Sequence, residues 1–486
     1  VNEAPGGVNA GEVFDVSITV EIDGEEVFSA SGLDFANYCG IMHLSTLAGN
    51  YWPAYVHHDP TYVQCAGFPN LDVENGYDSS LRTGWAAEMA DPGWNAVMAQ
   101  STPGYNRGFI EYMDATGPQP YLAMVSDSCA AWLMDGHPSA QNYAMDQAEA
   151  LSAAPWFMWL PTEGRWINRV DRPGYSSLYA SSGLQPKHSA TVNASEGGSP
   201  GPALMTAGWV HMPGSMGVPL ILKGRLLLLE TVQARATYSA VHTYYTALPP
   251  GEDDIMLREA AWTRRSIAEA AFCTPPDDPI YDVIHDLIDA IQVRRSEQVA
   301  ERIVSQGDMH GFGVGLYGSP SVNTGVWMDA YDLTSTYQWH LMGYDMDEYI
   351  DFVLNFWMKL FSTEPDNRGG GRLGFPRLAV AFNHGCAVYN LGAPGPGYPD
   401  GSFLKTAQEW VQATNDIAGN NFNDGLVMKE VAASLQILRA LRPDDTRIPA
   451  AIAAMAASQP DLTPFNAAAY RSNPGWSIVA PGTTRA

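Results

Sequence analysis

The chain has 486 residues, of which 46% are apolar, and carries 53 acidic against 26 basic side chains, a formal net charge of −27. Such an acidic surface repels nucleic-acid phosphates and anionic membranes, so no nucleic-acid partner is expected. The longest apolar run, Val218 to Leu229, is interrupted by Pro219, Lys223 and Gly224. It is much shorter than the roughly 20 residues of a membrane span, so no membrane insertion is expected.

The N-terminal part predicts a small region of strands and loops. Residues 11–30 alternate polar and apolar side chains on either side of Asp23-Gly24, which is typical of a β-hairpin. Residues 31–116 are rich in Gly, Pro, Asn, Asp and aromatic residues and show little helical periodicity. We therefore expect a first region at 1–116, followed by a helical domain at 117–486.

The rest of the chain predicts six helical hairpins. In each of them an apolar helical stretch ends at Gly, Pro or Asp and is followed by a second helical stretch. One pair cannot bury its apolar face alone, so the pairs must stack, and six pairs predict a closed double ring. The fold class is therefore mainly α, an (α/α)6 toroid with a smaller N-terminal β and loop-rich region. The pairs span 117–156, 204–247, 254–304, 323–362, 375–417 and 423–459.

Several links between pairs are long, and we expect these long links to lie together on one rim of the ring. The segment 157–203 is far longer than the roughly 12–15 residues of ordinary loops, and loops of such length commonly bind or gate something. It contains Trp159, Trp166 and Arg169. Aromatic faces beside polar groups can grip sugar rings, which makes these three residues candidate substrate-binding residues. The alternative is that these aromatic side chains fill the interior of the helical toroid.

Carboxylates at the starts of the inner helices are candidates for glycoside hydrolysis, which uses two carboxyl groups across a cleft. The first candidates are Asp329 and Asp332, at the start of one inner helix. Asp329 follows Trp327 in an otherwise apolar and aromatic helix that also holds Tyr331. A carboxylate there is costly unless it is paired, for instance with Arg, or used in catalysis. Glu259 and Asp424 are candidate second carboxylates, although Asp424 is also a plausible helix N-cap.

A second chemistry is indicated by Asn383-His384, at the start of the inner helix of the fifth pair. This Asn-His element resembles that of polysaccharide lyases built on helical toroids. The resemblance implies that Asn383 or an upstream arginine neutralises a uronate carboxylate while His384 removes the neighbouring proton. The upstream arginines are Arg368, Arg372 and Arg377. A hydrogen-bonded structural pair is the alternative. His211, at the start of the second pair's inner helix, is a further candidate substrate contact.

The five cysteines are odd in number and lack metal-ligand spacing. The spacing of the histidines is not typical of metal ligands, and the sequence has no nucleotide-binding glycine loop. We therefore expect no metal and no cofactor. We expect the helical cysteines to be small core residues, and Cys39 and Cys65 to be able to pair in an oxidising compartment. The helical cysteines are Cys129, Cys273 and Cys386.

The helix-pair pattern resembles the (α/α)6-toroid superfamily of glycoside hydrolases and polysaccharide lyases. The stretches from Trp209 to Glu230, Trp327 to Asp329 and Asn473 to Val479 also resemble helical proteins encoded by bacteria and their phages. These resemblances imply a secreted or virion-borne protein that binds a polysaccharide in the ring cleft, as a hydrolase or a lyase. The competing hypothesis is a non-catalytic structural or adhesion component, a homo-oligomer or part of a larger assembly.

Overall fold

The structure is a computed structural model of the chain, and parts of the chain lie outside the residues that it describes. It describes residues 13–22, 24–36, 68, 71–73, 75–91, 94, 121–152, 156–157, 159–160, 164–166, 212–243, 257–306, 311, 323–324, 326–361, 386–387, 425–458 and 468–480.

Most of the described residues are helical, so the expectation of a mainly α chain is confirmed. The helices are α2 (Ser79–Ala90), α4 (Asp127–Asp135), α5 (Pro138–Leu151), α7 (Gly217–Lys223), α8 (Leu226–Thr243), α9 (Leu257–Cys273), α10 (Tyr281–Gln306), α11 (Val326–Leu341), α12 (Asp347–Leu360), α15 (Gly425–Leu441) and α16 (Arg447–Ser458), with short 3-10 turns η6 (Ala468–Ser472) and η7 (Pro474–Trp476).

The described strands form two-stranded antiparallel pairs. The predicted N-terminal hairpin is confirmed: β1 (Val13–Ile22) pairs with β2 (Glu25–Ala36) across a turn in which Gly24 has a φ of 83°. A second hairpin joins β3 (Trp159–Leu160) to β4 (Arg165–Trp166). The third pair joins β5 (Asn323–Thr324) to β6 (Cys386–Ala387).

The predicted helix at Cys386 was wrong, because Cys386 lies in β6 and pairs with Thr324. Its pairing with Thr324 is a contact between segments far apart in sequence, which local helical periodicity cannot indicate.

The described helices include both members of five of the six predicted helix pairs, and the fifth pair, 375–417, lies almost entirely outside the described residues. The break between α4 and α5 shows how Gly and Pro separate the two helices of a pair. Gly136 ends α4 in the left-handed conformation, with φ 66°, a geometry that glycine adopts without strain. The Nδ1 atom of His137 then accepts a hydrogen bond from Ser139 N, and Pro138 stands at the start of α5.

Contacts between Cα atoms divide the chain into two compact units. Unit 1 comprises Val1–Asp59, Asp78–Pro249 and Glu269–His285, and unit 2 comprises Pro60–Tyr77, Pro250–Ala268 and Asp286–Ala486. The unit boundaries fall within α9 and α10. The expected division between residues 116 and 117 stays a prediction, since residues 95–120 lie outside the described part of the chain.

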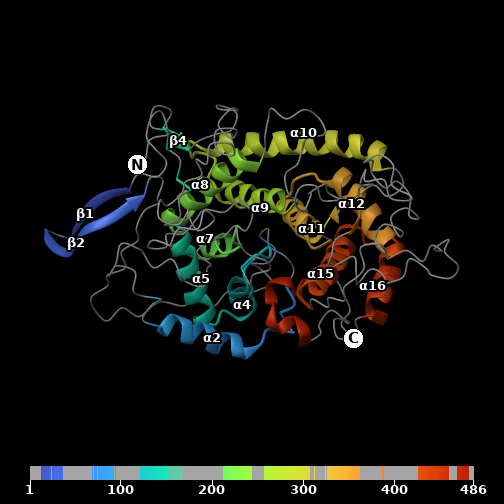
Figure 1. Cartoon of the computed structure of the whole chain (residues 1–486), viewed down its shortest axis with the longest axis horizontal. Coiled ribbons are helices and arrows are strands. Elements are labelled where there is room, and N and C mark those ends of the chain that lie inside the picture. Colours follow the sequence, from blue (N-terminus) through green and yellow to red (C-terminus); the bar gives the residue numbers. More distant parts are fainter. Residues whose placement is uncertain are drawn as a thin grey trace, which may run out of the picture. The chain divides into compact units, whose positions relative to one another are not determined.

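In unit 1, α2 runs beside α5, as Figure 1 shows. Trp94 and Trp85 pack against the ring of Tyr143, with ring centroids 4.9 and 5.7 Å from it. The Tyr143 hydroxyl donates to Glu88 at 2.6 Å, and the Trp94 indole donates to Asp146 at 2.7 Å. The Tyr143 hydroxyl and the Trp94 indole are therefore both satisfied, as burial requires.

A buried ion pair between Arg235 of α8 and Glu269 lies in the interior of unit 1. Arg235 also donates to the carbonyl oxygen of Pro213 at 2.9 Å. The carboxylate of Glu269 lies against Gly217, where a Cβ atom would stand 3.0 Å from its Oε1. This close approach explains the glycine at the start of α7.

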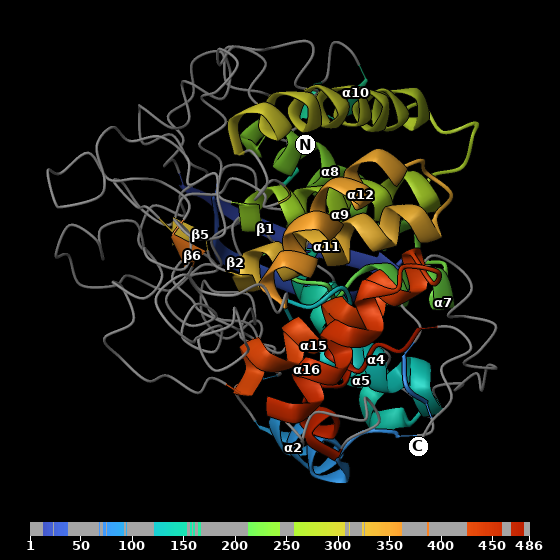
Figure 2. The same cartoon turned by 90° about the vertical axis from the view of Figure 1, so that its right-hand side faces the viewer.

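In unit 2, α11 packs directly against α15, and α16 packs against α12 and α15 (Figure 2). The C-terminal segment closes on an early part of the chain, because Leu71 bridges Ile478 and Asp72 N donates to Ser477 O at 2.7 Å. Backbone segments about 400 residues apart in sequence are thus joined within one unit.

Gly311 lies against the backbone of α12. Its φ is 119°, and a Cβ atom built on it would stand 2.2 Å from the carbonyl oxygen of Phe352 and 2.7 Å from the backbone nitrogen of Phe356. Both the space and the backbone conformation at this position therefore require glycine.

Candidate functional site

The start of α11 carries the largest group of predicted functional residues within the described part of the chain, namely Trp327, Asp329 and Tyr331. Every residue from 328 to 339 is buried, although many of them are polar. A helix that is buried on all faces has no solvated side on which to place its polar groups. The polar side chains of α11 must therefore find partners inside the protein or act on a ligand.

Asp332 is fully engaged by neighbouring side chains. It forms salt bridges with Arg264 of α9 and with Arg295 of α10, the latter at 2.9 Å, and the Tyr349 hydroxyl of α12 donates to it. The Arg295 guanidinium also lies over the Tyr349 ring, 4.1 Å from the centroid. We call these four residues the Asp332 cluster. Because its carboxylate is held by two cations and a hydroxyl, Asp332 has a structural role.

Asp329 lies one helical turn before Asp332 and is only 4% exposed. Burial raises the pKa of the Tyr349 hydroxyl, the positive charges of Arg295 and Arg302 oppose that rise, and the negative charge of Asp329 adds to it. Asp329 is thus electrostatically coupled to the Asp332 cluster. The two sequence hypotheses for Asp329, buried pairing and catalysis, both stay predictions.

Tyr331 stands at the centre of a group of aromatic rings. Its ring centroid lies 4.5 Å from that of Trp262, 5.6 Å from that of Trp476 in a stacked geometry, and 5.5 Å from that of Trp327 in an edge-on geometry. Its hydroxyl bonds to Oε1 of Glu430, on α15, at 3.1 Å. We call these five residues the Tyr331 cluster.

Within the Tyr331 cluster, Trp327 is the ring with solvent exposure. Trp262, Tyr331 and Trp476 are buried, whereas Trp327 is half-buried at the first turn of α11. The Arg265 guanidinium covers the Trp262 ring at 4.3 Å from its centroid, which adds a cation–π contact on the interior side. Trp327 is therefore the partly exposed ring of a packed aromatic group.

Two other predicted aromatic residues lie in unit 1. Trp166 of β4 is half-buried and packs edge-on against Phe157, with centroids 5.5 Å apart. Trp159 pairs with Trp166 in the backbone register of the β3–β4 hairpin. The hairpin thus brings two tryptophans of the long segment 157–203 together at one cross-strand position.

The remaining predicted residues fall outside what the structure describes. Glu259 lies in α9, but its side chain is not among the described ones. The others lie wholly outside the described residues: Arg169, His211, Arg368, Arg372, Asn383, His384 and Asp424.

Glu430 and Trp476 join the site although the sequence analysis did not select them as site residues. Glu430 is a fully buried carboxylate within α15, which is otherwise mostly apolar. A carboxylate in such a helix is the same signal that selected Asp329, so Glu430 could have been found from the sequence. Trp476 reaches the site from η7, close to the C-terminal end of the described chain, and no local pattern indicates that contact.

Among the residues that the structure describes, no cluster of three or more His, Cys, Asp or Glu side chains could hold a metal ion. No helix in the described part of the chain is sufficiently long and apolar to cross a membrane. No protein-family model matches the chain, and no curated protein or solved structure is significantly similar to it.

Proposed function

We propose that this protein binds a polysaccharide, with Trp327 as a stacking surface at the start of α11. The observation that carries the proposal is the half-buried Trp327 ring, which packs edge-on with the buried Tyr331. A flat ring fixed by packing presents a preorganised surface for the C–H face of a sugar. Asp329 lies in the same first turns of α11 as Trp327, and Glu430 of α15 belongs to the Tyr331 cluster. Carboxylates can accept hydrogen bonds from sugar hydroxyls.

The fold that we propose around this site is the (α/α)6 toroid. Five helix pairs support it, and so does the burial of the first helix of several pairs, as in α4, α11 and α15. A ring closed in chain order would set a helix of 375–417 between α11 and α15. In the structure these two helices pack directly on each other. We also propose that the protein is secreted or carried on a virion.

Two chemistries are compatible with the proposal. Hydrolysis would use Asp329 with Glu259 or Asp424 as the second carboxyl group. Lyase chemistry would use Asn383 and His384, with Arg368 or Arg372 neutralising a uronate. Asp332 is unsuited to either role, because its carboxylate already pairs with Arg264 and Arg295.

The second candidate function is a non-catalytic structural or adhesion protein. It is favoured by the burial of the site, since Asp329 is 4% and Tyr331 2% exposed. A catalytic carboxylate must contact its substrate, and in this structure solvent barely reaches Asp329. In that function Trp327 binds a glycan on the surface or packs against a neighbouring subunit, and no bond is cleaved.

A glycan array on the purified full chain tests binding, with Trp327→Ala as the diagnostic variant. We expect its affinity for the glycan to fall at least about tenfold, which corresponds to about 1.4 kcal/mol. Tyr344→Ala is the matched control, because Tyr344 is also a half-buried ring, at the opposite end of α11 against Trp339. Binding that is lost equally in both variants, or absent from the wild type, contradicts the proposal.

Activity assays separate the enzyme from the scaffold. Reducing-end release reports hydrolysis, and ultraviolet absorbance of unsaturated products reports lyase action on the glycans that bind. Asp329→Asn should abolish the first activity and His384→Ala the second. Glycan binding with neither activity in the wild type would establish the non-catalytic function.

A further inference from the structure

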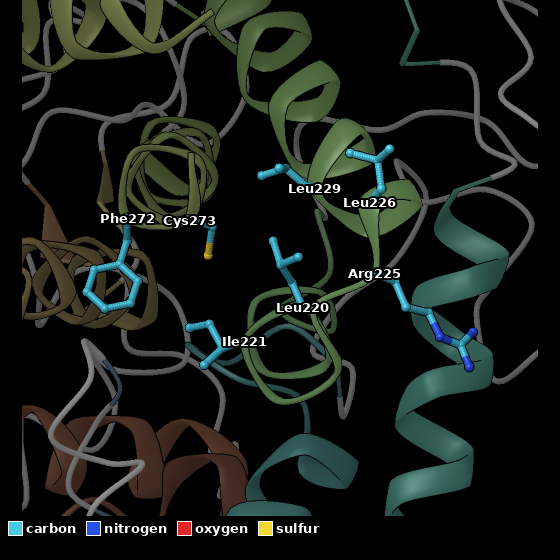
Figure 3. Close-up of a pocket in the computed structure, with 8 residues that line it drawn as sticks. Leu220, Ile221, Arg225, Leu226, Leu229, Phe272 and Cys273 are labelled. Carbon is cyan, nitrogen blue, oxygen red and sulfur yellow. The ribbon is translucent and has the colours of Figure 1, made fainter. Parts of the chain in front are cut away.

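A pocket in unit 1 lies between α7, α8 and the end of α9, and it shares no residue with the Tyr331 cluster (Figure 3). Its volume is about 440 Å³, within the range of small-molecule sites. The lining residues are Leu220, Ile221, Gly224, Arg225, Leu226, Leu229, Phe272 and Cys273.

The side chains of the pocket are apolar and some of them face solvent. Leu226 is 67% and Phe272 42% exposed, and both are among the few large apolar side chains that are exposed in the described part of the chain. Two such side chains at one concave place leave apolar surface in contact with water. Burying this surface beneath a ligand is favourable by the hydrophobic effect.

Several polar groups of the lining residues are paired within the protein. Gly224 N–H donates to Leu220 O at 2.7 Å, and the carbonyl oxygen of Arg225 accepts from the N–H groups of Leu228 and Leu229. The Arg225 guanidinium pairs with Glu149 of α5, and Figure 3 shows this side chain pointing away from the lining leucines. Among the described lining residues, Arg225 alone is charged, so the pocket offers a ligand no free ionic partner.

Cys273 completes the lining as a neutral group. It is a free, half-buried thiol at the end of α9. Burial raises its pKa to about 12, with a further contribution from the negative charge of Glu269. At neutral pH the protonated thiol behaves as a small apolar side chain.

We propose that this pocket binds an uncharged, apolar small molecule, such as the alkyl chain of a neutral lipid or alcohol. The lining supplies apolar area without a charge to hold an anionic headgroup.

The test measures binding of the neutral fluorescent probe N-phenyl-naphthylamine to the full chain, with decanol and decanoate as competitors. We expect saturable probe binding that decanol displaces at lower concentration than decanoate. Preferential displacement by decanoate would overturn the assignment of an uncharged ligand. Absence of saturable probe binding would overturn the site.

Two variants locate the probe. Ile221→Trp fills the pocket and should raise the probe Kd at least tenfold, whereas Ile303→Trp on α10, an exposed position that does not line the pocket, should leave it unchanged. If Ile221→Trp loses its helical circular dichroism signal, Leu226→Gln decides instead, because Leu226 is exposed and its loss removes apolar contact without a core cavity. An unchanged probe Kd in the folded pocket variant overturns the proposal.

Alkylation of Cys273 provides an independent readout. Decanol in the pocket should slow the reaction of Cys273 with N-ethylmaleimide at least threefold, as measured by mass spectrometry of its peptide. The fully buried Cys129 should remain unmodified with or without decanol. Equal rates at Cys273 in the presence and absence of saturating decanol would place the ligand elsewhere.

Discussion

Arg295 and Asp332, 37 positions apart in sequence, meet inside unit 2 with Nη2 and Oδ1 2.9 Å apart, and Arg264 binds the same carboxylate oxygen. One buried carboxylate thus pairs with two buried cations and accepts a hydrogen bond from Tyr349. Buried ions are tolerated when they are paired, and removal of one partner leaves an uncompensated charge.

Asp332→Asn is therefore expected to destabilise the protein by about 3–5 kcal/mol. Urea unfolding followed by circular dichroism measures the loss. Asp351→Asn is the matched control, since Asp351 pairs with Arg442 at 2.6 Å but is 65% exposed, and exposed pairs contribute about 0–1 kcal/mol. Similar losses in both variants would show that the Asp332 cluster does not hold the helices together.

Two glycines should respond in opposite directions to alanine. Gly217→Ala places a methyl group 3.0 Å from Glu269 Oε1, and such overpacking costs about 1–3 kcal/mol. Gly84→Ala, within the exposed face of α2, meets no atom within 4 Å. Alanine in a helix is favoured over glycine, so this variant should gain about 0.5–1 kcal/mol. Thermal unfolding of the two variants compares them, and a gain at position 217 would refute the contact with Glu269.

Alkaline pH should destabilise the fold through buried weak acids. Burial raises the pKa of Cys129 from 9.0 to about 12, and it also raises the pKa values of Tyr349 and Tyr470. The unfolded chain releases these protons at lower pH than the folded chain does. Stability from Cys129 is thus fully present below pH about 9 and declines by about 1.4 kcal/mol per pH unit as pH rises towards its folded pKa.

The measurement is the urea midpoint as a function of pH, compared between the wild type and Cys129→Ala. The alanine variant starts from lower stability, because a buried side chain has been truncated. Its stability should nevertheless fall less steeply above pH about 9. Parallel pH profiles would contradict the role of this thiol.

The hydrogen bond from Tyr331 to Glu430 should be measurable by a double-mutant cycle. Tyr331→Phe leaves the buried Glu430 without this donor, and the cost is about 1–3 kcal/mol. Glu430→Gln removes the charge that the hydroxyl stabilises. We expect a coupling energy of at least about 0.5 kcal/mol between the two changes, as is usual for residues in direct contact. Strictly additive effects would show that the bond contributes nothing.

The hairpin boundaries were predictable from sequence because the signals that set them are local. Gly136 ends α4 and Pro138 opens α5 within one short segment, and Gly224 ends α7 in the same left-handed conformation. Glycine and proline act through their own backbone geometry, which needs no knowledge of the remaining fold.

The buried polar contacts were not predictable, because their partners are far apart in sequence. Gln233 and Arg235 of α8 resemble surface residues locally, yet Gln233 bonds to Thr274 and Asp278, and Arg235 pairs with Glu269. Sequence analysis selected Asp329 for its apolar surroundings. It could not show that the next carboxylate along α11, that of Asp332, pairs with arginines from two other helices.

The glycine at position 311 limits how this protein can change during evolution. Because Phe352 O and Phe356 N occupy the space of any Cβ atom there, no amino acid with a side chain can be accommodated without moving α12. A saturation library selected for folded protein should return glycine codons alone at this site. In diverged homologues, residue 311 should accordingly stay fixed while the sequence around it drifts.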